Sequence, residues 1–253
     1  MTTNKLEIFK EIATTISNVI HTYSLTAEKQ VDEKFKLQLG YSIYFLTNIY
    51  VLLKSVADYN NQDEITDEIF ESNMLIWQAC NSTLASTQLI RQGYPLEPQN
   101  IMRVALESFS LAMSFHLDDI SYTKYLNNKL SGEKTILLTK KTLKEIGEIY
   151  GLLSAVTHPS KKTIGNNFNP QTNSLIIGGG YTEELSNRVL SNFAIQNYLL
   201  LTIWKGAELI FYKFENNPKF WQINNNGDYT LNLDKSLKDI VKLIGKDFKI
   251  LNV

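Results

Sequence analysis

Apolar residues recur at helical spacing along almost the whole chain. Residues three and four positions apart lie on one face of a helix, so this spacing predicts amphipathic helices rather than strands. The sequence therefore predicts an all-α fold, a helical bundle of about six to seven long helices. The predicted helices cover about residues 3–23, 26–59, 64–92, 96–116, 118–129, 133–157 and 182–214.

Two segments break the helical pattern. Residues 163–180 and 220–233 place Asn, Gly or Pro between short β-favouring runs, which is typical of β-hairpins. The second segment is followed by "DKSLKDIVKLIGKDF", which has the pattern of a short amphipathic helix. We therefore expect a helical bundle in residues 1–217 and an appendage, a hairpin plus a short helix, in residues 218–253. The N-terminal helices of residues 1–60 either belong to the bundle or extend it.

Composition and charge restrict the classes of partner. Of 253 residues, 43% are hydrophobic, which is enough for a large core. Lys and Arg (25) balance Asp and Glu (26), so the formal charge of -1 creates no global attraction for nucleic acid or an acidic membrane, and such contacts need a local patch. The single cysteine, Cys80, excludes an internal disulfide framework and a Cys-rich zinc site. Together with an N-terminus that lacks the apolar core of a signal peptide, it predicts a cytoplasmic protein.

The two most apolar runs are interrupted by charge. Lys54 lies within residues 41–57, and Lys205 and Glu208 lie within residues 198–212. A membrane span needs roughly 20 predominantly apolar residues. Both runs are therefore predicted to be long core helices, and no membrane contact is expected. Because the helices of residues 26–59 and 182–214 are also rich in aromatic residues, they predict a homodimer.

A small-residue face marks the helix that ends in "YGLLSAVTHPSKK". Gly147, Gly151, Ser154 and His158 recur at spacings of four, three and four, so they share one helix face. A helical glycine costs about 1 kcal/mol relative to alanine, and two of them predict that another helix backbone approaches closely. Pro159 disfavours helical geometry at His158, so the imidazole is expected to project from the last turn.

A polar line on the helix of residues 96–116 matches this face. Arg103, Glu107, Ser110 and Ser114 share one side of a helix that is otherwise apolar. Such a helix is normally buried, so its polar groups must be paired. Arg103 and Glu107, four residues apart, are predicted to pair with each other and to form one cluster with His158.

Two interpretations of this cluster remain open. Buried Arg and Glu pairs often only fix helix register, which gives a structural role. In the functional interpretation His158 acts as acid or base, Arg103 as the cation for a phosphate or a transition state, and Glu107 orients the arginine. Lys161 and Lys162 add cations beside the imidazole, where a phosphate could bind.

The sequences "RVALESF" within one core helix and "LSAVTHPS" at the end of a later one resemble the HEPN-like superfamily, in particular its divergent, largely uncharacterised prokaryotic branch. The resemblance covers roughly residues 64–214. It implies an all-α fold, frequent homodimers, and relatives that are metal-independent RNA endonucleases in toxin and antiphage systems. Active members carry an Arg followed after four to six residues by a His. Here Gly151, Leu152 and Leu153 occupy those positions before His158, so the arginine would come from Arg103 on another helix.

Three functions are therefore compatible with the sequence. The first is a catalytically silent or divergent module of a prokaryotic stress or antiphage defence system, which binds RNA, a nucleotide or a partner protein. The second is a metal-independent RNA endonuclease that uses His158 and Arg103. The third is a purely structural helical scaffold. No cofactor or metal is predicted, because the acidic segments 62–72 and 115–119 fit helix ends and connectors and no histidine pair is spaced to bind zinc.

Overall fold

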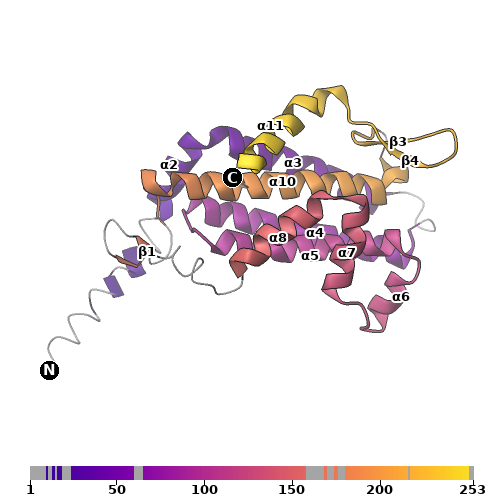
Figure 1. The fold of residues 1–253 in the computed structure, drawn as a ribbon, viewed down its shortest axis with the longest axis horizontal. Helices are drawn as coiled ribbons and strands as arrows, with labels where there is room; N and C mark the ends of the chain where they lie inside the picture. Colours follow the sequence, from indigo (N-terminus) through magenta and orange to yellow (C-terminus); the bar gives the residue numbers. More distant parts are fainter. Residues whose placement is uncertain are drawn as a thin grey trace.

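The long helices lie alongside one another as a bundle in the computed structural model (Figure 1). The predicted all-α fold with two small hairpins is confirmed. The α-helices are α2 (Ser24–Lys34), α3 (Lys36–Ala57), α4 (Asp67–Arg91), α5 (Glu97–Leu117), α6 (Ser121–Leu126), α7 (Gly132–Thr142), α8 (Glu145–Thr157), α10 (Ser186–Ile210) and α11 (Lys238–Ile250). The structure describes residues 10, 13–14, 16–18, 24–59, 65–157, 168–169, 174–175, 180–215 and 217–250. Most of the predicted helix 3–23 lies outside these residues.

The predicted helix 26–59 bends at Phe35, which separates α2 from α3. The backbone hydrogen bonds continue through the bend, from the Phe35 N–H to the Val31 carbonyl (2.8 Å) and from the Leu39 N–H to the Phe35 carbonyl (2.9 Å). The Phe35 ring is buried, with its centroid 6.3 Å from that of Tyr181 and 6.0 Å from that of Phe193. The bend thus brings a core side chain against α10.

The predicted helix 133–157 is two helices, which corrects the sequence interpretation. α7 ends at Thr142, and α8 begins at Glu145. Between them Leu143 has a non-helical backbone (φ -117°, ψ 89°) and a fully buried side chain. Because neither Gly nor Pro marks this break, the apolar spacing runs on through it. Burial of Leu143 lets the chain turn, so that α7 and α8 both pack against α5.

Both predicted hairpins are present. β1 (Phe168–Asn169) pairs with β2 (Ser174–Leu175), and β3 (Trp221–Ile223) pairs with β4 (Tyr229–Leu231), each in antiparallel register. The turn between β3 and β4 is built by its own polar side chains: the Asn224 Oδ1 atom accepts from the N–H groups of Asn226 and Asp228, both at 2.9 Å. This is how Asn stabilises a turn, as its abundance in the segment predicts.

α10 is the central helix of the bundle. It packs against α3, α4, α5, α8 and α11, and Figure 1 shows α11 and the β3–β4 hairpin on one side of it and α4 and α5 on the other. Amide side chains within this core are hydrogen-bonded. The Gln196 Nε2 atom donates to the Thr87 hydroxyl (2.7 Å) and the Ser42 hydroxyl (3.2 Å), and Ser42 donates to the Asn197 Oδ1 atom (2.7 Å). α10 is therefore linked to α3 and α4 by polar contacts as well as by apolar packing.

A buried carboxylate joins the C-terminal segment to α10. Glu208 is 1% exposed and accepts hydrogen bonds from the backbone N–H groups of Lys219 (2.7 Å), Phe220 (2.7 Å) and Trp221 (3.0 Å). Burial raises the pKa of Glu208, while the three N–H donors oppose this rise because they favour the carboxylate. The charge in the core is thus held by the start of the hairpin.

Aromatic contacts cover the rest of this junction. The Phe220 ring packs edge-on against Trp204 at 5.0 Å between centroids, and Phe248 of α11 stacks on Tyr198 of α10 at 4.1 Å. The Trp221 indole N–H donates to the Lys205 carbonyl (2.7 Å). The hairpin and α11, predicted as an appendage, therefore share a core with α10.

Candidate functional site

Arg103 and Glu107 form the predicted pair on α5. The Arg103 Nε atom lies 2.9 Å from the Glu107 Oε1 atom. The guanidinium carbon also lies 5.4 Å from the ring centroid of Tyr150 on α8, and the Nη2 atom lies 3.5 Å from the Tyr150 hydroxyl. We call these three residues the Arg103 cluster. α5 and α8 thus pack together as predicted, with Tyr150 as a member that the sequence interpretation missed.

The Arg103 cluster lies at the edge of the core rather than inside it. The Arg103 side chain is 23% exposed and that of Glu107 is 43% exposed, which corrects the expectation that the whole polar line is buried. Farther along the line, Ser110 and Ser114 are fully buried, and the Ser114 hydroxyl donates to the Leu111 carbonyl (2.7 Å). The physical reason is the cost of desolvation, which is far larger for charged groups than for hydroxyls.

The small-residue face of α8 does not receive another helix backbone, so that prediction is wrong. Gly151 is exposed, and a Cβ atom added there would meet nothing within 4 Å. At Gly147 an added Cβ would lie 2.7 Å from the Cε atom of the Lys140 side chain. The face of α8 that enters the core instead carries buried apolar residues: Ile146, Ile149 and Leu153.

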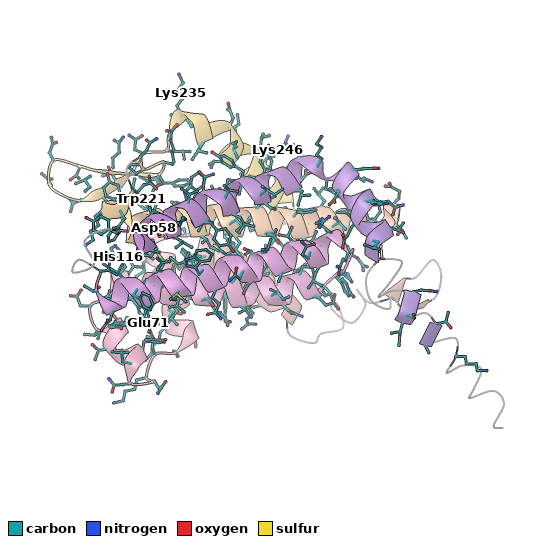
Figure 2. The ribbon with its side chains drawn as sticks, turned by 180° about the vertical axis from the view of Figure 1, so that it is seen from behind. Asp58, Glu71, His116, Trp221, Lys235 and Lys246 are labelled. Carbon is teal, nitrogen blue, oxygen red and sulfur yellow. The ribbon has the colours of Figure 1, made fainter. Side chains whose placement is uncertain are left out.

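The other predicted site residues are not part of the described structure. His158, Lys161 and Lys162 all lie outside the described residues, beyond the end of α8 at Thr157. His116 is described, and it lies exposed on the last turn of α5, at the end of the bundle where α4 begins (Figure 2). At 1.5 Å per residue it is roughly 20 Å along the helix from Arg103, so it cannot act on the same phosphate.

A cavity of about 780 Å³ lies where the C-terminal segment covers α10. We call it the C-terminal cavity. Most of its lining is apolar and comes from α10, the hairpin and α11, including Leu201, Phe220 and Val241. Figure 2 shows two of the elements around it, with Trp221 labelled on β3 and Lys246 on α11. The amphipathic pattern of α11 was the signal in the sequence, but it does not indicate which helix α11 meets.

An ion pair lies in the wall of the C-terminal cavity. The Lys205 Nζ atom is 3.0 Å from the Glu145 Oε1 atom, and the two side chains are 13% and 28% exposed. Nearby, burial raises the pKa of the Tyr198 phenol, and the charges of Glu145 and Glu148 raise it further. Tyr198 therefore stays protonated at neutral pH and can donate a hydrogen bond.

A second, more open groove of about 610 Å³ lies on the outer side of α4 and is lined by Met74, Trp77, Ile101 and Tyr125 among others. Arg103 lines neither this groove nor the C-terminal cavity. The described residues hold no group of three or more His, Cys, Asp or Glu side chains that could bind a metal ion. Among the same residues, every helix is too short or too polar to cross a membrane.

Comparisons of the chain with models of protein families, with curated proteins and with solved structures found no match. The HEPN-like resemblance therefore rests on the two short motifs "RVALESF" and "LSAVTHPS".

Proposed function

We propose that the protein is a HEPN-like helical module that binds single-stranded RNA without cleaving it, as a component of a prokaryotic stress or antiphage defence system. The observation that supports this proposal is the geometry of the Arg103 cluster. Glu107 holds the guanidinium in place over the Tyr150 ring, and the Arg103 side chain is 23% exposed. Proteins bind unpaired bases by stacking them on aromatic rings and guanidinium planes, and arginine also binds phosphate.

A local positive patch is needed because the chain has no net positive charge. α7 ends with Lys140 and Lys141 in its last turn, and the Lys140 side chain reaches Gly147, one turn before Gly151 on α8. The Lys140 ammonium group therefore lies beside α8, within one turn of Tyr150. A phosphate backbone that follows α8 would meet it next to the Arg103 cluster.

The structure favours this proposal over the two alternatives on specific grounds. A ribonuclease needs a base and a cation in one cleft, and His116, the one histidine among the described residues, lies roughly 20 Å along α5 from Arg103. Arg103 and Glu107 both reach solvent, so the pair is accessible to a ligand. A partly exposed ion pair of this kind contributes only about 0.2–1 kcal/mol to stability, so its contribution to the fold is small.

Substitutions in the Arg103 cluster test RNA binding directly. Arg103→Ala and Tyr150→Leu are each expected to weaken binding of a labelled single-stranded RNA roughly tenfold, since stacking contributes about 1–3 kcal/mol per base. Arg103→Lys keeps the charge but loses the planar surface, so we expect it to weaken binding as well. Fluorescence anisotropy measures the affinity. Lys129→Ala, which removes one exposed cation after α6, is the charge-matched control and should change the affinity little.

The same samples distinguish binding from cleavage. We expect wild-type protein to leave the RNA intact with and without a chelator, and the variants to keep their melting temperatures. Chelator-resistant cleavage that His158→Ala reduces about 10²- to 10⁴-fold would instead support the ribonuclease, with Arg103 as its phosphate-binding cation. Wild-type protein that neither binds nor cleaves RNA would contradict both functions.

We also propose that two copies assemble through the outer face of α3. Its exposed apolar side chains are Leu37 (60%), Ile43 (57%), Tyr44 (40%) and Val51 (64%). The other helix expected at the interface, α10, is almost entirely buried within its own bundle, so α3 supports the proposal and α10 does not. A stable homodimer buries at least about 1,200 Å² in total.

Light scattering at micromolar concentration tests this assembly. Wild-type protein should have the mass of a dimer, and Val51→Glu should have the mass of a monomer, because a charge at the centre of an apolar interface is costly to desolvate. Lys129→Glu, at the exposed position after α6 and away from α3, provides the control for added negative charge. A monomeric wild type would rule out the dimer.

A further inference from the structure

The C-terminal cavity is separate from the Arg103 cluster, and it is shaped by different elements. α10 forms its floor with Tyr198, Leu201 and Thr202, while the hairpin, α11 and the Lys205–Glu145 pair form its walls. Its volume of about 780 Å³ lies within the range of roughly 300–1,000 Å³ that is typical of small-molecule sites. Apolar side chains from α10, the hairpin and α11 thus line a space large enough for an extended hydrocarbon chain.

Charge is distributed unequally around this apolar space. Its lining contains three lysines, Lys205, Lys242 and Lys246, and one carboxylate, Glu145. Lys205 is already paired with Glu145 in the wall. Lys242 and Lys246 are four residues apart on α11, so they lie on one face of that helix, and both are exposed. The mouth of the cavity therefore presents two ammonium groups beside an apolar interior.

We propose that the C-terminal cavity binds a single-chain amphiphile with an anionic head group, of which a fatty carboxylate is the simplest example. The hydrocarbon chain lies against Leu201, Phe220 and Val241, and the head group lies between Lys242 and Lys246. This proposal goes beyond RNA binding and does not depend on it.

The chemistry of the lining disfavours cationic amphiphiles and short-chain acids. A cationic amphiphile would place its head group beside two lysines, where like charges repel. A short-chain acid would fill little of the apolar space and would gain little from leaving water, because the hydrophobic gain scales with the apolar area that is buried. Both the chain and the charge of the ligand are therefore needed for binding.

Isothermal titration calorimetry with dodecanoate, below the concentration at which it forms micelles, tests the preference. We expect dodecanoate to bind the full-length protein at one site with a dissociation constant in the micromolar range. Dodecyltrimethylammonium, with the same chain and the opposite charge, should bind at least about tenfold more weakly, and so should butanoate. Equal binding of the anionic and cationic amphiphiles, or no binding of dodecanoate, would overturn the proposal.

Gly245 allows the cavity to be filled without disturbing the fold. It lines the cavity from within α11, and a Cβ atom added there would meet nothing within 4 Å. Gly245→Leu should therefore weaken dodecanoate binding at least about tenfold, while the melting temperature stays the same or rises because glycine is a poor helix former. Gly245→Ala makes the same change in helix propensity with a much smaller side chain, and it should retain most of the binding. Unchanged affinity in Gly245→Leu would place the ligand elsewhere and overturn the proposal.

The charge of the head group is tested on α11. The double variant Lys242→Gln and Lys246→Gln should weaken dodecanoate binding roughly tenfold and leave the binding of dodecanol, which has no charge, unchanged. Lys238→Gln removes one charge from the same helix outside the cavity and serves as the control. If the protein did not bind dodecanoate but sedimented with anionic phospholipid vesicles, the proposal would be overturned. Lys242 and Lys246 would then belong to a membrane-binding surface. RNA binding measured on the same variants should remain that of wild type.

Discussion

Replacing Glu208 by alanine is expected to lower the free energy of unfolding by about 3 kcal/mol. The carboxylate is the acceptor for three backbone N–H groups at the start of the β3–β4 hairpin, on Lys219, Phe220 and Trp221. Removing it leaves these donors, of which those of Phe220 and Trp221 are buried, without their partner, and it also opens a gap beside Phe220. Chemical denaturation followed by circular dichroism measures the change.

Glu215→Ala is the matched control for this substitution. Glu215 follows α10 closely and accepts a hydrogen bond from the exposed N–H of Asn217 (2.9 Å). Its removal should change the free energy of unfolding by no more than about 0.5 kcal/mol, as is usual at the surface. If Glu208→Ala and Glu215→Ala had equal effects, the buried carboxylate would not join the hairpin to α10 in solution.

Replacing Gly93 by alanine should lower the free energy of unfolding by about 2–4 kcal/mol, an effect similar to that of Glu208→Ala. Gly93 has φ +77°, a conformation that side chains with a Cβ rarely adopt, and an added Cβ would lie 2.1 Å from the Gly180 carbonyl oxygen. The close contact arises because the Gly180 N–H donates to the Gln92 carbonyl (2.8 Å), which brings two backbones together. Neither backbone can move aside without losing hydrogen bonds. Thermal and urea unfolding would both detect the loss.

Gly151→Ala is the opposite case and serves as the control for Gly93→Ala. Gly151 is exposed within α8 and has open space around it, so alanine should stabilise the protein by about 0.5–1 kcal/mol. If Gly93→Ala left the free energy of unfolding unchanged, the close contact between Gly93 and Gly180 would not persist in solution. A destabilised Gly151→Ala variant would revive the close helix approach that the structure contradicts.

Local signals explain which helix ends were predictable. Gly93 ends α4 with the two hydrogen bonds of a Schellman motif, from the Gly93 N–H to the Ile90 carbonyl and from the Tyr94 N–H to the Leu89 carbonyl, both at 3.0 Å. Pro98 lies in the first turn of α5, where its missing N–H costs nothing. These residues act within a few positions of themselves, so the sequence is enough to identify their role.

The breaks at Phe35 and Leu143 had no such local signal. Both residues are apolar and buried, and both continue the helical spacing on either side. What bends or stops the helix there is the position of other elements, such as α10 beside Phe35 and α5 beside α7 and α8. Packing of this kind overrides the local helix propensity, and it cannot be predicted from a single sequence.

The candidate site also has a part that local spacing predicts and a part that depends on contacts between helices. Arg103 and Glu107 pair across one turn of one helix, which their spacing predicts. Tyr150 joins them from another helix, and although it is the only aromatic residue of α8, nothing in its spacing assigns it to α5. The C-terminal cavity was even harder to predict from the sequence, because Lys205 and Lys246 line the same cavity only once α11 has packed along α10.

The hydrogen bonds of Gln196 have a consequence for how the bundle chooses one arrangement among many. Sliding α10 by one turn, about 5.4 Å, along α3 and α4 would still place apolar residues against apolar residues over much of the interface. It would also move the Gln196 Nε2 atom away from Thr87 and Ser42 and leave this buried donor without these partners. Competing packings that a purely apolar core would tolerate are thereby penalised, so these few amides contribute to the uniqueness of the native state as well as to its stability.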